Sequence, residues 1–209
     1  MNLPARWWMS FRGCDSNITC QRSMKEDADG PVHVFTDVFN LLPSHCVNQV
    51  QQMKPRDGDN AQLRAAAHTR QRDFLLAERS ILEPGKLGRG CLKHGSCECP
   101  VVWQPPANTE GNCQPLTVNF SGPMCLPWAV MGKNEEDMAH WSMQSFHAWL
   151  AHVAAGHYDV VFLENAPGFK FRHFQRPMSK RYTVLKIVFG SEDRQPSRHL
   201  CQQSVDNNM

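Results

Sequence analysis

The sequence lacks any apolar run of about 20 residues, the length that a membrane-spanning helix needs. Its first 14 residues include Arg6 and Arg12 and no continuous apolar core, unlike a secretory signal peptide. These absences predict a protein of the nucleus or the cytoplasm with no membrane partner. Nine cysteines among 209 residues are an odd number, and in a reducing compartment they predict thiols and not a disulfide framework.

A strong overall charge is also missing, with 22 Lys and Arg residues against 20 Asp and Glu residues. The balance hides a basic C-terminal part, because residues 166–209 hold eight basic and three acidic side chains. Basic and aromatic residues alternate there, in the order Phe169, Lys170, Phe171, Arg172, Phe174, Arg176, Lys180, Arg181, Tyr182 and Lys186. This pattern suits a nucleic-acid backbone, and a solvated basic face accounts for it equally well.

Two short apolar runs predict parallel strands whose ends carry reactive side chains. Residues 116–120 predict a buried strand that ends at a Gly-Pro pair, and Cys125 follows between two prolines on a stiff loop. Residues 159–163 predict a second strand, which ends at Glu164. A thiol and a carboxylate at neighbouring strand ends form a nucleophile with an acid partner. An inert cysteine and a helix-capping glutamate are the alternative.

The sequence around these strand ends resembles two motifs of the DNA cytosine-5 methyltransferase family. The matching segments are Gly122-Pro123-Met124-Cys125-Leu126-Pro127-Trp128 and Glu164-Asn165-Ala166-Pro167-Gly168. The resemblance implies that Cys125 attacks C6 of a flipped-out cytosine while Glu164 holds N3 of the base. It also implies the α/β, Rossmann-like fold of S-adenosylmethionine-dependent methyltransferases, with a mostly parallel sheet and helices on both faces.

The beginning of the chain has the pattern of half a nucleotide-binding α/β unit. A strand, a helix and a second strand are predicted over residues 10–15, 17–26 and 32–36. By resemblance to the same family, Asp15 holds the ribose of S-adenosylmethionine and Asp37 its adenine. Val38 and Pro123 are expected to complete the contacts to this cofactor. Aspartates at strand ends are also common caps.

Other parts of the family pattern are altered or missing. Residues 1–9 contain no glycine and cannot form the glycine-rich turn that the family places against the methionine part of the cofactor, so weak or absent cofactor binding is expected. Arg198, in a segment that resembles a further motif, is expected to touch the base O2 or a phosphate. The alternative is that Arg198 is an exposed charge in a frayed C-terminal tail, residues 191–209. The match predicts a single partial catalytic domain over residues 1–209, without a target recognition region.

An irregular insertion rich in Cys, Gly and Pro is predicted over residues 83–112. It contains Cys91, His94, Cys97 and Cys99, which match a structural zinc site in ligand type. Four ligands within nine residues are more crowded than in typical zinc sites, so thiols in a loop are the alternative and no metal is assigned.

The remaining elements are predicted from periodicity and composition. Residues 44–85 are expected to be mostly helical, with a polar loop over residues 54–60. Residues 135–153 predict a helix whose aromatic stripe, including Trp141 and Trp149, packs in the core. Residues 182–190 predict a final strand.

Together these patterns predict transfer of a methyl group from S-adenosylmethionine to C5 of cytosine in DNA. Two further interpretations belong to other functional classes. One is a truncated, non-catalytic relative that binds DNA or a protein partner. The other is an interaction module stabilised by zinc.

Overall fold

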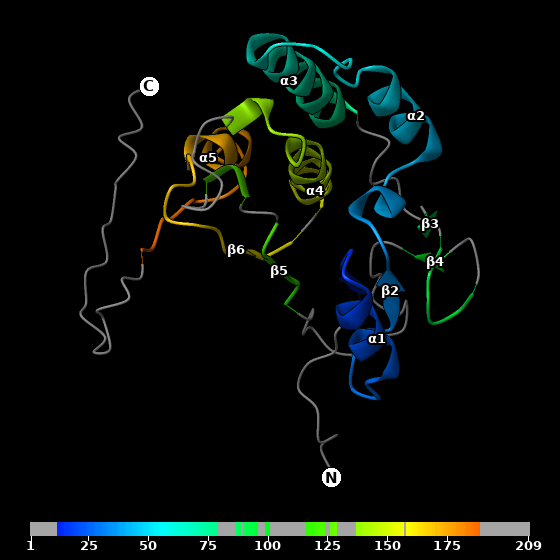
Figure 1. Cartoon of the computed structure of the whole chain (residues 1–209). Helices are drawn as coiled ribbons and strands as arrows, with labels where there is room; N and C mark the ends of the chain where they lie inside the picture. Colours follow the sequence, from blue (N-terminus) through cyan, green and yellow to red (C-terminus); the bar gives the residue numbers. More distant parts are fainter. Residues whose placement is uncertain are drawn as a thin grey trace.

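A computed structural model of the chain (Figure 1) describes residues 12–78, 87–88, 90–95, 99–100, 116–123, 126–128, 137–156 and 158–188. With η for a 3-10 helix, its elements are β1 (Arg12–Cys14), α1 (Ile18–Glu26), β2 (His33–Phe35), η1 (Val38–Leu41), α2 (Ser44–Gln52), α3 (Ala61–Ala77), β3 (Leu87–Gly88), β4 (Cys99–Pro100), β5 (Val118–Ser121), η3 (Leu126–Trp128), η5 (Asp137–Ala139), α4 (Met143–Ala155), β6 (Val160–Leu163) and α5 (Arg172–Met178).

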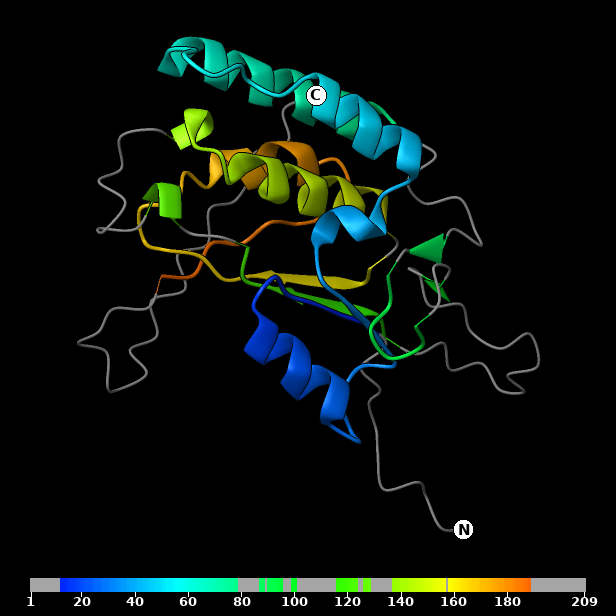
Figure 2. The same ribbon diagram turned by 45° about the vertical axis from the view of Figure 1, so that its right-hand side comes forward.

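Two pairs of parallel strands form the middle layer of the molecule. β1 pairs with β2, with Gly13 opposite Val34, and β5 pairs with β6, with Phe120 opposite Phe162. Figure 2 shows α1 on one side of these strands and α4 and α5 on the other, with α2 and α3 outermost. β3 and β4 form a separate antiparallel pair. The chain is therefore mixed α/β with short parallel strands, as the sequence predicts.

The first strand, helix and strand follow the predicted order. The Asn17 side-chain Oδ1 accepts hydrogen bonds from the backbone N–H groups of Thr19 (2.8 Å) and Cys20 (3.4 Å). These N–H groups have no partner within the first helical turn, so the cap fixes where α1 begins. The strand β2 that follows is buried along its whole length.

α2 and α3 lie next to each other on the outside of α4. Asn60 caps α3, because its Oδ1 accepts a hydrogen bond from the backbone N–H of Leu63 (2.9 Å). Gln71 on α3 is fully buried, and its Nε2 donates to the backbone carbonyl of Val50 on α2 (3.0 Å). A buried and satisfied polar contact of this kind fixes how the two helices align.

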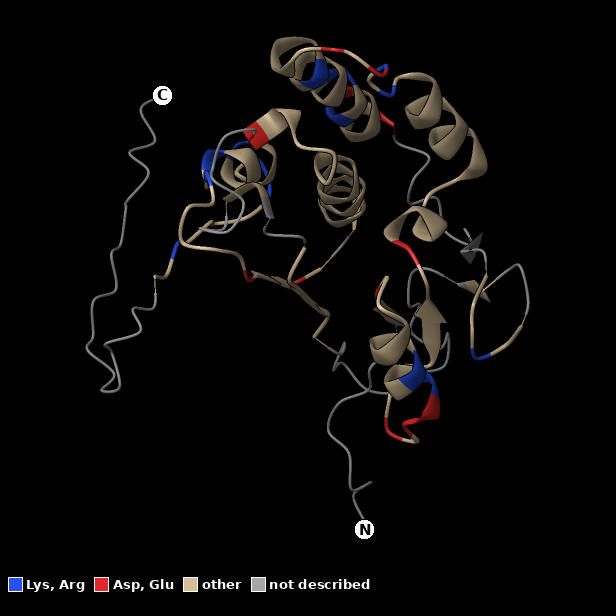
Figure 3. Ribbon diagram, in the orientation of Figure 1, with Lys and Arg blue, Asp and Glu red and all other residues tan. Residues whose placement is uncertain are grey.

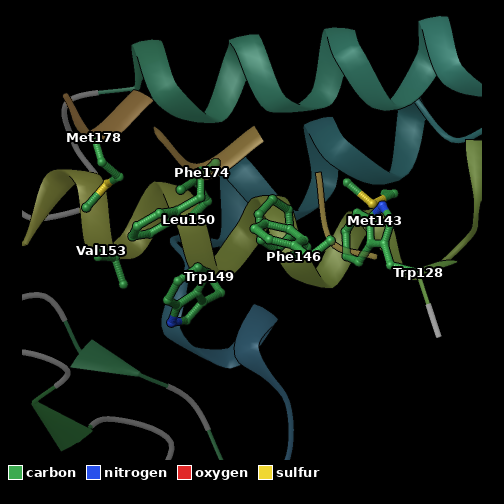
Figure 4. Packing of buried hydrophobic residues seen from close by; sticks show 9 residues of the cluster. Trp128, Met143, Phe146, Trp149, Leu150, Val153, Phe174 and Met178 are labelled. Atoms are coloured by element: carbon green, nitrogen blue, oxygen red, sulfur yellow. The ribbon is translucent and has the colours of Figure 1, made fainter. Parts of the chain in front are cut away.

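The largest hydrophobic cluster surrounds α4 (Figure 4). Its buried members are Trp128, Met143, Phe146, Trp149, Leu150, Val153, Phe169, Phe174 and Met178. Burial of such side chains stabilises the fold by about 1.5–3 kcal/mol each, before the loss of chain entropy is counted. The helix begins only at Met143, and Trp141 in the preceding turn is 62% exposed. The expectation that Trp141 lies in the core is wrong, because the helical period does not extend back to it.

β5 and β6 bury one face only. Val161 and Leu163 pack against the cluster around α4, whereas Phe120 and Phe162 stack on the other face with ring centroids 4.6 Å apart. Successive side chains of a strand point to opposite faces, which explains the division. Phe120 is 75% exposed, so the prediction of a buried strand over residues 116–120 is wrong for this face.

The predicted strand over residues 182–190 is not found in its described part, residues 182–188. Leu185, Ile187 and Val188 are exposed there, and no described strand pairs with them. A strand needs a neighbouring strand, and a local apolar run does not reveal whether one exists. None of the helices in the described ranges is both long and apolar enough to cross a membrane.

Candidate functional site

The C-terminal ends of β5 and β6 bring the two predicted reactive segments together. Ser121 lies opposite Leu163, and the backbone N–H of Glu164 donates to the carbonyl of Ser121 (2.9 Å). The next side chain, Asn165, donates from Nδ2 to the carbonyl of Pro123 (3.4 Å). Glu164 and Asn165 therefore lie directly beside the segment that leads into the predicted nucleophile loop.

Gly122 leaves room for the Glu164 carboxylate. A Cβ atom at Gly122 would lie 3.1 Å from Oε2 of Glu164, closer than most Cβ contacts. The Glu164 side chain is exposed, so a ligand that approaches this strand edge can reach it. Cys125 and Arg198, the other two residues predicted to act on the base, lie outside the described residues.

A buried tryptophan on α4 supports the end of β5. Trp149 donates from Nε1 to Oγ of Ser121 (2.6 Å), and Ser121 donates from Oγ to Oδ1 of Asn119 (2.7 Å). A chain of two hydrogen bonds in a largely buried region restricts the orientation of each member. It therefore fixes the strand end from which the segment Gly122-Pro123 departs.

Asp137 joins the segments that follow β5 and β6. Its Oδ1 accepts a hydrogen bond from Nε1 of Trp128 (3.1 Å) and lies 3.1 Å from Nε2 of His173. Its Oδ2 accepts a hydrogen bond from Nζ of Lys170 (2.5 Å). Burial alone raises the pKa of Asp137, but its hydrogen bonds, that of His173 foremost, outweigh burial and hold this pKa well below the usual range. Sequence reasoning missed Asp137, because its partners lie far from it in the chain.

Asp15 and Asp37 lie at the ends of β1 and β2, as the sequence predicts. The backbone N–H of Asp15 donates to the carbonyl of Phe35 (3.2 Å), so the two strand ends lie side by side. Each acid also caps its own turn. Oδ1 of Asp15 accepts from the N–H of Asn17 (2.7 Å), and Oδ1 of Asp37 accepts from the N–H of Phe39 (2.8 Å).

Val38 and Pro123, the other residues expected at a cofactor, are half-buried. Val38 packs against each of the three hydrophobic clusters found among the described residues, and the backbone carbonyl of Pro123 accepts the hydrogen bond of Asn165. The acids at the strand ends match the hydroxyl and amine donors of a nucleoside. The described ranges contain no glycine-rich turn for a methionine group. Binding of S-adenosylmethionine by these residues stays a prediction.

The basic segment around α5 contains side chains of two kinds. Arg181 has a structural role, because its Nη1 donates to the carbonyl of Gly156 (2.8 Å) at the C-terminal end of α4. Arg172 and Arg176 on α5 are exposed like Arg181, but their guanidinium groups make no hydrogen bond within the described residues, and Figure 3 shows basic residues on this helix. These two arginines are the ones available to a phosphate backbone.

A second cluster of reactive side chains lies at the start of β2. The ligating atoms of His33, Cys91, His94 and Cys99 all lie within 4.8 Å of one another. Burial alone raises the pKa of the Cys91 thiol, but hydrogen bonds from the neighbouring backbone and from His94 outweigh burial and lower this pKa to about 7. Sequence reasoning found the last three residues, together with Cys97, which lies outside the described residues. It missed His33, because no local spacing connects that residue with the cysteines.

Comparisons with known proteins give no match: no family model fits the chain, and none was found among the curated proteins or the solved structures. A functional proposal for this chain therefore rests on its motifs and on where the fold places them.

Proposed function

We propose that the protein transfers a methyl group from S-adenosylmethionine to C5 of cytosine in DNA, on a Rossmann-like methyltransferase fold. The observation that carries the proposal is the position of Glu164 beside the segment that leads to Cys125. Parallel pairing of β5 and β6 brings a carboxylate and the start of a cysteine loop to one edge of a sheet. Attack on a pyrimidine ring needs this combination of nucleophile and acid.

In the proposed reaction, the Cys125 thiolate forms a bond to C6 of the cytosine ring. Protonated Glu164 donates its proton to N3, and the electron pair of the C5–C6 double bond makes C5 nucleophilic. S-adenosylmethionine, when bound, supplies an electrophilic methyl group and leaves as the neutral thioether. Loss of the C5 proton to a base then restores the double bond, releases the Cys125 thiolate and returns the N3 proton to Glu164.

The described residues support the positioning that this reaction needs. A cytosine inside a duplex is out of reach, so the base must leave the stack. The exposed Glu164 side chain lies at a strand edge that such a base can approach, and the Asn165–Pro123 hydrogen bond holds the two segments together. Asp15 and Asp37 are proposed to hold the nucleoside of the cofactor. Arg198 is proposed to touch the base or a phosphate.

The experiment that tests this proposal measures two events on one DNA duplex. Tritium at C5 of cytosine is released to water when Cys125 has added to C6 and a proton or a methyl group replaces it. A labelled methyl group on S-adenosylmethionine reports transfer to the base. We expect tritium release by the full chain, lost in Cys125→Ser, reduced at least about 100-fold in Glu164→Gln, and unchanged in Cys20→Ser.

Each outcome separates parts of the proposal. Tritium release without methyl transfer would support the roles of Cys125 and Glu164 and contradict methyl transfer as the activity of this chain. Folded protein that binds DNA and gives neither signal would contradict the enzyme, and a non-catalytic DNA-binding protein would take its place. Tritium release that persists in Cys125→Ser would show that another group attacks the base.

A further inference from the structure

We propose that His33, Cys91, His94 and Cys99 bind one zinc ion, which fastens the insertion to β2. This site is separate from the proposed methyltransferase site and does not depend on that activity. It also differs from the set that sequence spacing suggests, because His33 takes the place of Cys97.

The distances between the side chains match a tetrahedral site. Nδ1 of His94 lies 3.4 Å from Sγ of Cys91 and 3.5 Å from Sγ of Cys99, and Sγ of Cys91 lies 4.0 Å from Nδ1 of His33. Zinc–sulfur bonds of about 2.3 Å and zinc–nitrogen bonds of about 2.0 Å give tetrahedron edges of about 3.3–3.8 Å. The four donor atoms therefore surround a space of the right size with little rearrangement.

The four ligands of the proposed site are not crowded into nine residues, because they come from two distant segments of the chain. Cys91 and His94 lie on one turn, Cys99 lies on β4, and His33 comes from β2, 58 residues before Cys91. Structural zinc sites typically combine ligands from two separated segments. The turn that carries Cys91 and His94 is closed by a backbone hydrogen bond. Gly95 adopts φ +61°, and its N–H donates to the carbonyl of Cys91 (3.0 Å). Glycine adopts such a φ more readily than any other residue, because it has no Cβ atom.

The burial of the ligands and the net charge of the ion with its ligands also suit zinc. His33, Cys91 and Cys99 are 7%, 2% and 4% exposed. Two thiolates and two neutral imidazoles around Zn²⁺ give a net charge of zero, which suits a buried position.

The described part of the insertion has few buried side chains of its own, so a metal ion would add to the contacts that hold it to β2. Phe35, Leu41, Cys91 and Cys99 are the buried members of the local hydrophobic cluster, and β3 and β4 have two residues each. The backbone N–H of Leu92 donates to the carbonyl of Val34 (2.8 Å), which places the turn against β2 without the metal. Four protein ligands leave no open position for substrate, so the ion is structural.

A second group of metal-binding side chains serves as the comparison. His45, Cys46 and Glu78 also bring their ligating atoms within 4.8 Å of one another. This group has three members, and two of them are neighbours on α2. The His45 side chain is exposed, so water competes for its position. We therefore assign the zinc ion to the His33 site.

The test uses the full chain, stripped with a chelator and titrated with Co²⁺ as a spectroscopic substitute for zinc. We expect one Co²⁺ per chain, with the absorption bands of tetrahedral Co²⁺ bound by thiolates, and displacement by one Zn²⁺. Removal of a group that only hydrogen-bonds to a ligand costs about 10–100-fold in metal affinity, so removal of a direct ligand should cost at least about 100-fold. This decrease is expected in Cys91→Ser, Cys99→Ser, His33→Ala and His94→Ala.

Two control variants decide between the candidate sites. Cys97→Ser and His45→Ala should bind Co²⁺ as tightly as the unchanged chain and give the same spectrum. His94 is exposed, so His94→Ala keeps the test valid if the buried variants fail to fold. The proposal is overturned if the unchanged chain binds no metal, if His94→Ala binds as tightly as the unchanged chain, or if Cys97→Ser loses the ion while folded His33→Ala keeps it.

Discussion

At the scale of single residues, Asp137 holds together the segments around the proposed site with one carboxylate. Its φ of 37° lies in the left-handed region, which aspartate and asparagine adopt more readily than most residues. Asp137→Asn therefore keeps the backbone and removes the charge that Lys170 and His173 approach. The variant therefore measures how much the charge of Asp137 contributes to stability.

We expect Asp137→Asn to lower the free energy of unfolding by about 1–3 kcal/mol, because it removes hydrogen bonds to a charged group. Urea unfolding at pH 7 measures this change. Asp73→Asn is the matched control, since Asp73 is exposed and pairs with its neighbour Arg72. Its effect should stay within about 0.5 kcal/mol. Equal effects of the two substitutions would contradict the role of Asp137 as an anchor.

His147 should make the fold sensitive to mild acid. Burial lowers the pKa of His147 to about 3, and nearby basic groups, Arg72 foremost, act in the same direction. Neither ring nitrogen has a hydrogen-bond partner in the described part of the chain. Between about pH 6.5 and pH 3 the unfolded chain binds a proton that the folded chain does not. This residue therefore contributes a loss of stability as the pH falls through that range.

In His147→Phe we expect the slope of unfolding free energy against pH to decrease, by up to about 1.4 kcal/mol per pH unit. Urea titrations between pH 4 and pH 7 measure the slope. His45→Phe replaces an exposed histidine and should leave the slope unchanged. A steep acid slope that survives in His147→Phe would assign the effect to other groups, such as His68 and His33, whose pKa values burial also lowers.

The candidate residues that the sequence identified belong to contiguous motifs, and their roles stay predictions. Glu164 was found because an apolar run and an Asn-Ala-Pro-Gly segment surround it. Asp137 and His33 were missed because their roles depend on partners distant in the chain. Local spacing carries no information about such partners.

At the scale of elements, Arg181 stabilises the C-terminal end of α4. Its Nη1 donates to the carbonyl of Gly156 at 2.8 Å and to that of Ala154 at 3.4 Å. The last carbonyl groups of a helix lack partners within the helix, and a cation there also interacts favourably with the helix dipole. Arg181 belongs to the basic segment that the sequence suggests for DNA binding, but its side chain thus has a structural role.

We expect Arg181→Ala to destabilise the protein by about 1 kcal/mol, which lowers Tm by about 2–4 °C in a chain of this size. Thermal unfolding followed by circular dichroism measures the shift. Lys180→Ala is the matched control, because Lys180 is an exposed neighbour with the same charge. A larger effect from Lys180 than from Arg181 would contradict the capping role.

The sequence predicted helices more reliably than strand environments. α1 agrees with the helix expected over residues 17–26, where Asn17 is the cap, and α3 lies within residues 44–85, which were expected to be mostly helical. A strand was predicted over residues 182–190 and is not found in the described residues 182–188, and Phe120 was expected to be buried but is exposed. Both errors concern which neighbours a strand has, and those neighbours come from distant parts of the chain.

At the scale of the whole molecule, the exposed arginines Arg172 and Arg176 of α5 predict how the proposed DNA binding should respond to salt. Removing one side chain that binds a phosphate should flatten the dependence of log K on log salt concentration by about 1. Arg172→Ala with Arg176→Ala is therefore expected to reduce this slope by up to about 2. Fluorescence anisotropy with a labelled duplex at several salt concentrations measures it.

The control for that experiment lies on the opposite side of the molecule. Arg22 and Lys25 belong to α1, which the strands separate from α5 (Figure 2). Arg22→Ala with Lys25→Ala removes the same charge and should leave the slope almost unchanged. Equal slopes in both double variants would show a general effect of charge and no specific DNA-binding face.

The connectivity of the two parallel pairs has a consequence for how the chain folds. β1, α1 and β2 lie within residues 12–35, and β5, α4 and β6 within residues 118–163, so each parallel pair closes over a stretch of chain that contains its own helix. Pairing within one continuous stretch of chain lets each unit form without contacts from the other unit. Amide hydrogen exchange should therefore show two groups of protected backbone N–H groups with different opening free energies. A single common value would mean that the two units open only together.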